Sequence, residues 1–410
     1  MSNLKELIQQ HCPDGVEYKK LGELGVFYGG LSGKTKEDFK DGNAKFISYK
    51  NVFYNLSLNI DTDERVKIAE GEKQNTVQYG DVLFTGSSET PDECGMSSVL
   101  TQKTDEKLYL NSFCFGFRLH NPSQFCPDFL KHLFRSSELR KQIGKTASGT
   151  TRFNVSKKRF AEVSIPILPL PIQEEIARIL DNFAELQAEL QAELQKRLQQ
   201  YNYYRDKLLT FNDLNGGGYA VSVEWKKLGD IAQYAKERVD SSLISTHTYV
   251  SVENLLQNKE GKKDASTVPS GSLIKYEKGD ILIGNIRPYL KKIWLADIDG
   301  GTNGDVLTIR ITDKDIISSY LYHILASDAF FLYDMSYAKG AKMPRGDKTA
   351  VMNYIVPIPP LAEQQRIVDI LDRFHALTTD ITAGLPAEIE ARRKQYEYYR
   401  DQLLTFKQKA

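Results

Sequence analysis

Apolar residues return at steps of three and four along the segment that follows Ile172. This spacing places them on one side of an α-helix, and about forty residues in such a helix would span on the order of 60 Å. Pro169 and Pro171 suit the start of the helix, and the Asn-Gly-Gly-Gly run at 215–218 suits its end and a linker. The stripe consists of Ile176, Ile179, Leu180, Phe183, Leu186, Leu190, Leu194, Leu198, Tyr201, Tyr204 and Leu208.

A second stripe of the same kind lies near the end of the chain. It is interrupted by Gly384-Leu385-Pro386, which predicts a kink or break near 384–386 with Pro386 starting a new helical segment. Because an isolated helix cannot bury such a stripe, we expect the two helices to pack against each other, antiparallel. The second stripe consists of Ile367, Ile370, Leu371, Phe374, Leu377, Ile381, Leu385, Ile389, Tyr396, Tyr399 and Leu403.

Shorter patterns precede each stripe. Strand-like runs occur at 81–84, 113–119, 280–283 and 306–311, with glycine and Asp/Asn turns between them. Helix-like stretches follow at 127–143 and 315–335. The sequence therefore predicts an α/β fold in which two long antiparallel helices separate two globular α/β domains.

The two halves of the chain are related by an internal repeat. Residues 165–183 and 356–374 agree at ten of nineteen positions with an offset of 191, and residues 201–211 and 396–406 agree at nine of eleven. The intervening segments are hardly alike. A pseudo-twofold molecule suits a twofold partner such as duplex DNA. The predicted divisions are a first domain at 1–165, a hinge and helix at 166–213, a second domain at 214–355, and a hinge and helix at 356–410.

Composition narrows the class of protein. The formal net charge is zero, which argues against a generally basic nucleic-acid coat. No apolar run approaches the roughly 20 residues of a membrane span, and the first residues do not resemble a signal peptide. All four cysteines lie in the first third without a C-x-x-C pair, so free thiols are favoured over disulfides or a zinc site. We expect a cytoplasmic protein.

Motifs for catalysis fail on inspection. The segment 29–35 suggests a phosphate-binding loop, but Tyr28 stands where its first glycine is required. The six histidines form no H-x-x-x-H or H-E-x-x-H pair, and no N/D-P-P-Y/F/W methyltransferase segment occurs. The sequence thus disfavours a stand-alone nuclease or methyltransferase.

A local basic segment precedes the first hinge. Between residues 131 and 160, nine Lys/Arg face Glu138 alone, a local charge of +8. Its loop at 144–152 mixes small, hydroxyl and cationic residues that can approach phosphates closely. DNA contact is the favoured interpretation, and a solvated helix face with a flexible loop is the alternative. The candidates are Lys145, Thr150, Thr151, Arg152, Lys157 and Lys158.

The same offset of 191 leads to residues 339–348 in the second half, where Gly340 aligns with Gly149 and Lys348 with Lys157. One interpretation is a DNA-contacting loop equivalent to the first, with Lys342, Arg345 and Lys348 as candidates. The alternative is an exposed loop whose charge is incidental.

A further basic segment, Arg-Pro-Tyr-Leu-Lys-Lys at 287–292, follows a predicted strand. Arginine can grip guanine through two hydrogen bonds, whereas lysine neutralises phosphate. We hypothesise that Arg287 reads a base, that Lys291 and Lys292 contact phosphate, and that Tyr289 lies against the sugar–phosphate backbone. The alternative is a strand end with solvated charges.

The repeated segments resemble the specificity (S) subunit of Type I restriction–modification systems. The resemblance rests on the hinge-and-helix segments that begin at Pro169 and Pro360, on the two YYRDxLLTF ends, and on HCPDGVEYKKLGEL at 11–24. Gly-Asp-Val-Leu at 80–83 and Gly-Asp-Ile-Leu at 279–282 share the family's appearance. The layout covers the whole chain, but specific motifs occupy only its repeated quarter.

This resemblance implies a non-catalytic DNA-binding subunit. Each globule would be a target-recognition domain that reads half of a split, asymmetric site in double-stranded DNA, and the helices would set the gap. Two modification (methyltransferase) subunits would dock on the repeated regions, with or without a restriction subunit that translocates DNA. The chain itself would bind no cofactor; S-adenosylmethionine, Mg and ATP belong to the partners.

Two glutamines, Gln173 and Gln364, lie just after the hinges and are candidates for partner docking, with hinge capping as the alternative. A protein of another class, a coiled-helix adaptor that spaces two protein-binding domains, would show no salt-dependent binding to duplex DNA.

Overall fold

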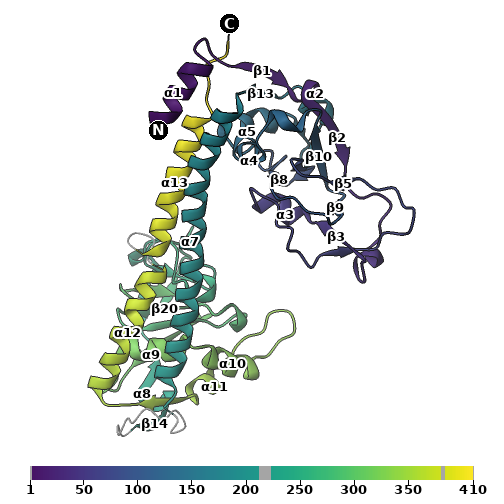
Figure 1. The fold of residues 1–410 in the computed structure, drawn as a ribbon. Helices are drawn as coiled ribbons and strands as arrows, with labels where there is room; N and C mark the ends of the chain where they lie inside the picture. The colour runs from purple at the N-terminus through teal and green to yellow at the C-terminus, as the bar shows by residue number, and fades with distance from the viewer. Residues whose placement is uncertain (1, 212–222, 380–383, 410) are drawn as a thin grey trace. The chain divides into compact units, whose positions relative to one another are not determined.

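The computed structural model describes residues 2–211, 223–379 and 384–409, and it divides into two compact units. The first unit comprises residues 1–189 and 390–410, and the second comprises residues 190–389. Each unit contains one globular domain together with parts of the long helices (Figure 1). The predicted linker at 215–218 lies outside the described residues.

The first long helix forms as predicted. It is α7, which runs without interruption over Leu170–Leu209. The second stripe forms two helices, α12 (Leu361–Thr379) and α13 (Leu385–Leu403). Pro386 is the second residue of α13, a position where its missing N–H needs no partner within the helix. A helix thus begins at Leu385, beside the proline at which the sequence predicts a new helical segment.

Within each unit the two helical stripes cover one another. In the first unit the ring of Phe183 on α7 stacks on Tyr399 of α13, with centroids 5.1 Å apart. In the second unit Tyr204 of α7 stacks on Phe374 of α12 at 5.7 Å. In both units the paired helices run antiparallel (Figure 1). The aromatic residues of the stripes are thus packing residues.

The domain of the first unit is a mixed α/β structure. Its sheets have the strand orders β2-β10-β6-β8, β4-β3-β9-β5, β11-β12-β7 and β1-β13. The helices are α1 (Ser2–His11), α2 (Leu21–Leu24), α3 (Tyr49–Tyr54), α4 (Pro127–Leu133), α5 (Ser137–Gly144) and α6 (Lys157–Phe160). The strands are β1 (Glu17–Lys20), β2 (Gly25–Gly29), β3 (Ala44–Ile47), β4 (Arg65–Val66), β5 (Thr76–Val77), β6 (Val82–Thr85), β7 (Ser87–Ser88), β8 (Ser97–Val99), β9 (Leu108–Leu110), β10 (Cys114–Leu119), β11 (Ala147–Ser148), β12 (Phe153–Val155) and β13 (Ser164–Ile167).

The domain of the second unit has the same kind of architecture. Its sheets have the orders β15-β22-β19-β20, β16-β18-β21-β17 and β14-β23. The helices are α8 (Leu228–Ile231), α9 (Ser318–Leu325), α10 (Asp328–Tyr337) and α11 (Lys348–Met352). The strands are β14 (Glu224–Lys227), β15 (Ala232–Tyr234), β16 (Arg238–Asp240), β17 (Tyr249–Val250), β18 (Ser272–Tyr276), β19 (Ile281–Gly284), β20 (Ile293–Leu295), β21 (Gly300–Thr302), β22 (Val306–Ile311) and β23 (Ile355–Ile358).

The central sheets of the two domains correspond strand by strand. In each, the strand of the Gly-Asp-Val/Ile-Leu segment lies in the middle, as β6 or β19, and is entirely buried. The aspartate of that segment forms a close ion pair with an arginine of the next central strand, Asp81 with Arg118 at 2.6 Å and Asp280 with Arg310 at 2.8 Å. The shared sequence segment therefore marks a shared structural core, confirming the α/β class and the repeat.

The helix-like stretches before the hinges differ from the prediction in one respect. Each forms two short helices, α4 and α5 in the first domain and α9 and α10 in the second. The break occurs at the same place in both domains, and a serine, Ser136 or Ser327, is the N-cap residue of the second helix. The hydroxyl of Ser327 accepts a hydrogen bond from the N–H of Phe330, which satisfies a free donor of the new helix.

A buried histidine attaches each domain to its helix. His132 Nε2 lies 2.8 Å from Asp181 Oδ1 on α7, and His323 Nε2 lies 2.8 Å from Asp372 Oδ1 on α12. Burial lowers the pKa of His132, so the neutral ring donates to the carboxylate. The repeat therefore preserves the contact between domain and helix.

In the described part of the chain, no helix is long and apolar enough to cross a membrane.

Candidate nucleic-acid interface

A small hairpin stands beside the central sheet of the first domain. Its strands β11 and β12 pair through Ser148 and Asn154, and β12 pairs with β7 through Asn154 and Ser87. Gly149 at the tip adopts a φ of +148°, a conformation that favours glycine. The tip residues 148–152 are all exposed. The loop selected from the sequence is thus presented to solvent by a defined framework.

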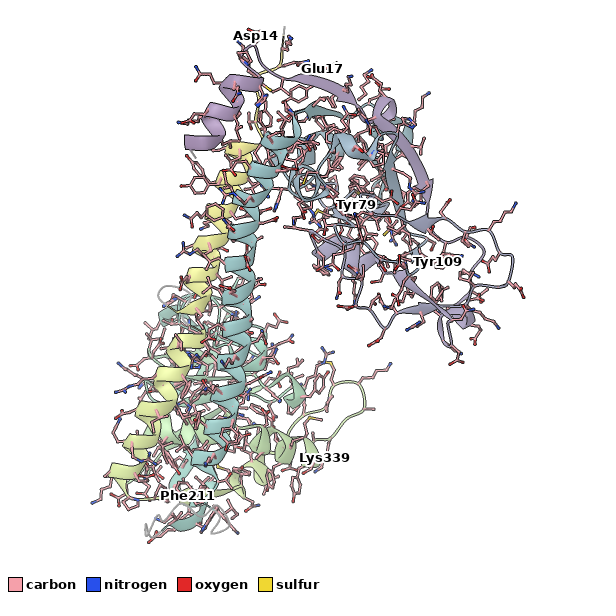
Figure 2. All side chains as sticks on the ribbon, viewed as in Figure 1. Asp14, Glu17, Tyr79, Tyr109, Phe211 and Lys339 are labelled. Atoms are coloured by element: carbon pink, nitrogen blue, oxygen red, sulfur yellow. The ribbon has the colours of Figure 1, made fainter. Side chains whose placement is uncertain are left out.

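The second domain carries the same arrangement. Lys339 pairs with Arg345, and Arg345 pairs with Ile286. These positions correspond to β11, β12 and β7 of the first domain. Gly340 has a φ of +107°. Lys339 marks the start of this loop after α10 (Figure 2). The two loops that align at an offset of 191 therefore have corresponding backbone pairing in their domains.

The exposed candidates of the first domain gather around this hairpin. Arg152 Nε donates to Ser87 Oγ at 3.1 Å, and its guanidinium lies 5.7 Å from the centre of the Phe113 ring. Lys157 begins α6, where its Nζ lies 5.5 Å from the ring centre of Phe115. Lys145, Thr150, Thr151 and Lys158 are also exposed. This set offers exposed cationic and hydroxyl groups of the kinds that contact phosphate.

Three residues that contributed to the basic segment have internal roles. Lys131 is ion-paired with Asp128 and Asp181, and Arg135 and Arg140 donate to backbone carbonyl groups of the domain. Burial lowers the pKa of both arginines to about 10. The charge of +8 counted along the sequence therefore overstates the charge available to DNA, because it includes cations used for folding.

In the second domain, Arg287 and Tyr289 are exposed, and Arg287 is held in the left-handed region with a φ of +54°. Such a conformation in a residue other than glycine costs free energy and tends to occur at functional sites. The N–H of Arg287 donates to Pro344 O at 2.7 Å, which ties it to the hairpin. The structure thus brings together Arg287 and the 339–348 loop.

The assignment of Lys291 and Lys292 to phosphate requires correction. Lys291 Nζ is ion-paired with Asp328 Oδ1 at 3.0 Å, and Lys292 Nζ donates to Val252 O at 2.6 Å. Burial lowers the pKa of Lys292. Each ammonium group thus has a partner within its own domain, which DNA phosphate would have to share or displace.

The remaining candidates of the second domain are exposed. Lys342 lies in the hairpin tip, and Lys348 is the first residue of α11. Arg345 Nη1 lies 3.0 Å from Asp305 Oδ1.

The two glutamines proposed for partner docking are fully buried, so that prediction is wrong for their side chains. Gln173 Oε1 accepts from the N–H of Cys126, and its Nε2 donates to Gln124 O and Leu168 O. Gln364 repeats this pattern with Ile317, Asp315 and Pro359. The amides therefore tie each hinge to its domain, in agreement with the hinge alternative.

Sequence reasoning missed a turn beside each hairpin. In the first domain, the N–H of Phe113 donates to Asn111 Oδ1 at 2.9 Å, and in the second the N–H of Asp305 donates to Asn303 Oδ1 at 3.1 Å. A signal in the sequence could have revealed this turn. Asn111 and Asn303 lie 192 residues apart, each shortly before a predicted strand, and asparagine often forms turns of this kind.

Over the described residues, no group of three or more His, Cys, Asp and Glu side chains is arranged to hold a metal ion.

Comparison with known proteins agrees with this architecture. The sequence matches the Type I restriction modification DNA specificity domain twice, over residues 13–200 and 221–391. It is similar to the EcoR124I/EcoR124II specificity subunit of Escherichia coli, with 34% identity over 264 residues, 59% of this chain and 61% of that protein. It is also similar to a putative type I specificity subunit of Haemophilus influenzae, with 32% identity over 278 residues, 63% of this chain and 68% of that protein.

Solved structures share the fold. The S subunit of a Type I restriction–modification system from M. genitalium aligns with a TM-score of 0.54 and 14% identity, over 95% of this chain and 96% of that chain. A chain from a structural study of the assembly of the type I R-M system aligns with a TM-score of 0.59 and 17% identity, over 96% of this chain and 98% of that chain. The duplicated domain match, together with the duplicated fold, shows that this chain belongs to the family of Type I restriction–modification DNA specificity subunits.

Proposed function

We propose that this chain is the non-catalytic, sequence-specific DNA-binding subunit of a Type I restriction–modification system, and that it recognises a bipartite, asymmetric target. The observation that carries the proposal is the pair of corresponding hairpin surfaces, which share a backbone framework but expose different side chains. Like frameworks suit two segments of one DNA duplex, whereas unlike side chains suit unlike half-sites.

The test is a comparison of adenine methylation across the genome of the host with and without this chain. A two-part motif should lose its methylation when the chain is removed and regain it when the chain is restored. If methylation is unchanged, the proposed function is wrong. An adaptor that spaces protein-binding domains would likewise leave the methylated motif intact.

The spacing of the two half-sites follows in this proposal from α7. This helix contains three consecutive Ala-Glu-Leu-Gln tetrapeptides at 184–195. Its two ends belong to different compact units of the structure. Each tetrapeptide adds about 6 Å to the length of the helix and a net rotation of about 40° about its axis.

Deleting residues 192–195 should therefore change the number of base pairs between the half-sites and leave both half-site sequences as they are. Methylation mapping reads out both quantities at once. Replacing the same four residues by alanines is the matched control, since it keeps the helix length and should keep the spacing. An unaltered gap in the deletion variant would contradict the proposal.

Docking of the modification subunits is assigned to the exposed side of the repeated helices. Tyr203 on α7 and Tyr398 on α13 occupy the same position of the repeat and are 60% and 59% exposed. Each packs edge to face on its neighbour, Tyr204 or Tyr399, with centroids 5.4 Å apart. Duplicate exposed aromatic residues offer equivalent anchors to two copies of one partner.

Replacing Tyr203 by serine should reduce the number of bound methyltransferase subunits from two to one, and replacing both Tyr203 and Tyr398 should abolish stable assembly. The mass of the co-purified complex measures the outcome. Tyr54→Ser changes a tyrosine that is 74% exposed but lies outside the repeat, and it should leave the assembly intact. Full assembly of the double variant would rule out these anchors.

A further inference from the structure

The turn beside each hairpin is fixed by the same set of hydrogen bonds. Beyond the asparagine bond within the turn, the carbonyl of Phe113 accepts the N–H of Gly86 at 2.7 Å, and the carbonyl of Asp305 accepts the N–H of Asn285 at 2.9 Å. Gly86 and Asn285 directly precede the segments that pair with the hairpins. The turn is therefore a rigid neighbour of the candidate DNA-binding surface in both domains.

The third residue of each turn meets an arginine of the hairpin. In the first domain this is the contact of Phe113 with Arg152, and in the second it is the ion pair of Asp305 with Arg345. All four side chains remain accessible, Phe113 being 60% exposed and the side chains of Arg345 and Asp305 56% and 38% exposed. The same position thus presents an aromatic ring in one domain and a carboxylate in the other.

The carboxylate indicates what part of the DNA this surface meets. An exposed carboxylate beside a phosphate is repelled, whereas beside base edges it can hold an arginine in position. The guanidinium is planar and carries five donors, so a bond from Nη1 to Asp305 leaves others free for the two acceptors of guanine. The aromatic ring of Phe113 instead matches an apolar group in the major groove, the thymine methyl.

We propose, on the basis of the function above, that Phe113 and Asp305 are matching specificity-determining positions. Asp305 is a positioning residue that orients Arg345 toward a guanine in the half-site of the second domain. Phe113, with Arg152 over its ring, contacts a thymine methyl group in the half-site of the first domain. The unlike residues at one position of a shared framework contribute to the asymmetry of the target.

Three variants of the full chain, assayed with its partner subunits by methylation mapping, test this proposal. Arg345→Lys keeps the positive charge but removes the planar fork, and it should lower discrimination at a single G·C pair of one half-site by at least about fivefold. Asp305→Asn should relax the same base pair to a smaller extent. Phe113→Ala should relax a single A·T pair of the other half-site.

The control is Asp264→Asn, which removes another exposed carboxylate from an ion pair elsewhere in the second domain, at His247. It should leave both half-sites unchanged. If Arg345→Lys and Asp305→Asn keep full selectivity, or weaken methylation at all sites alike, Arg345 contacts phosphate or nothing and the inference is wrong. A wild-type chain whose removal leaves the methylated motif intact would instead refute the proposed function itself.

Discussion

Replacing Arg135 by methionine should destabilise the first domain by about 3–5 kcal/mol, because several backbone carbonyl groups lose their donor at a cost of about 1–3 kcal/mol for each one left buried and unsatisfied. The guanidinium lies at the C-terminal end of α3, where helical carbonyl groups have no partner in the helix. It donates to the carbonyls of Val52, Phe53 and Asn55 at 2.8–3.3 Å and to Ser97 O on β8 at 2.6 Å. Methionine fills similar space but leaves all these acceptors buried without donors.

The loss should be local. Hydrogen exchange should accelerate in peptides covering α3, β6 and β8, while peptides from residues 249–311 of the second unit stay protected. Lys141→Met, which removes an exposed cation from α5, is the matched control and should change the free energy of unfolding by less than about 0.5 kcal/mol. An Arg135→Met variant as stable as its parent would show that solvent can replace the donors.

Replacing Asp334 by asparagine should stabilise the second domain at neutral pH. Asp334 lies on α10, is fully buried, and has no hydrogen-bond partner at either carboxylate oxygen. Asn285 Oδ1 is another buried acceptor without a donor. A Cβ atom at Gly346 would contact both this oxygen and the Asp334 carboxylate. Burial, with a contribution from Asp347, raises the pKa of Asp334 from its usual value to about 6.

The direction of the pH dependence follows from that shift. A carboxyl group whose pKa is raised on folding binds its proton more tightly in the folded state, so it costs nothing below its unfolded pKa. The cost grows as the pH rises from about 4 to 6, and it reaches about 3 kcal/mol above that range. Asp334→Asn removes this cost because the amide carries no charge.

The gain should accordingly be about 2–3 kcal/mol at pH 7 and close to zero at pH 4, measured by denaturant unfolding at both values. Asp328 on the same helix provides a control of opposite sign, because Lys259 and Lys291 lower its pKa to about 2. Asp328→Asn should therefore destabilise the domain at pH 7. A gain for Asp334→Asn that does not depend on pH would mean that the carboxyl group is not the origin of the effect.

The helices show how far periodicity alone reaches. The stripe from Ile176 to Leu208 predicts α7 because its spacing is a property of neighbouring residues, and Pro386 predicts the start of α13 for the same reason. The central strands were also found, since β22 coincides with the predicted run at 306–311. Local signals suffice where the structure itself is local.

The candidate site shows where such reasoning stops. Arg135 and Arg152 look alike in a count of charges, yet one donates to buried carbonyl groups and the other lies beside the exposed Phe113. Lys292 and Gln364 likewise use their polar atoms to bind backbone groups, which lie 40 residues away for Lys292 and up to 49 residues away for Gln364. Whether a polar side chain is free depends on these distant partners, which no local pattern encodes.

By itself, the sequence determined that this protein is a duplication, that its like parts are hinges and helices, and that its unlike parts are two α/β domains. Only the tertiary structure decided which polar residues of those parts face solvent, and it alone joined Asn303–Asp305 to the hairpin at Arg345. The physical reason is that helical periodicity is set by neighbouring residues, whereas exposure and convergence are set by contacts between segments distant in sequence.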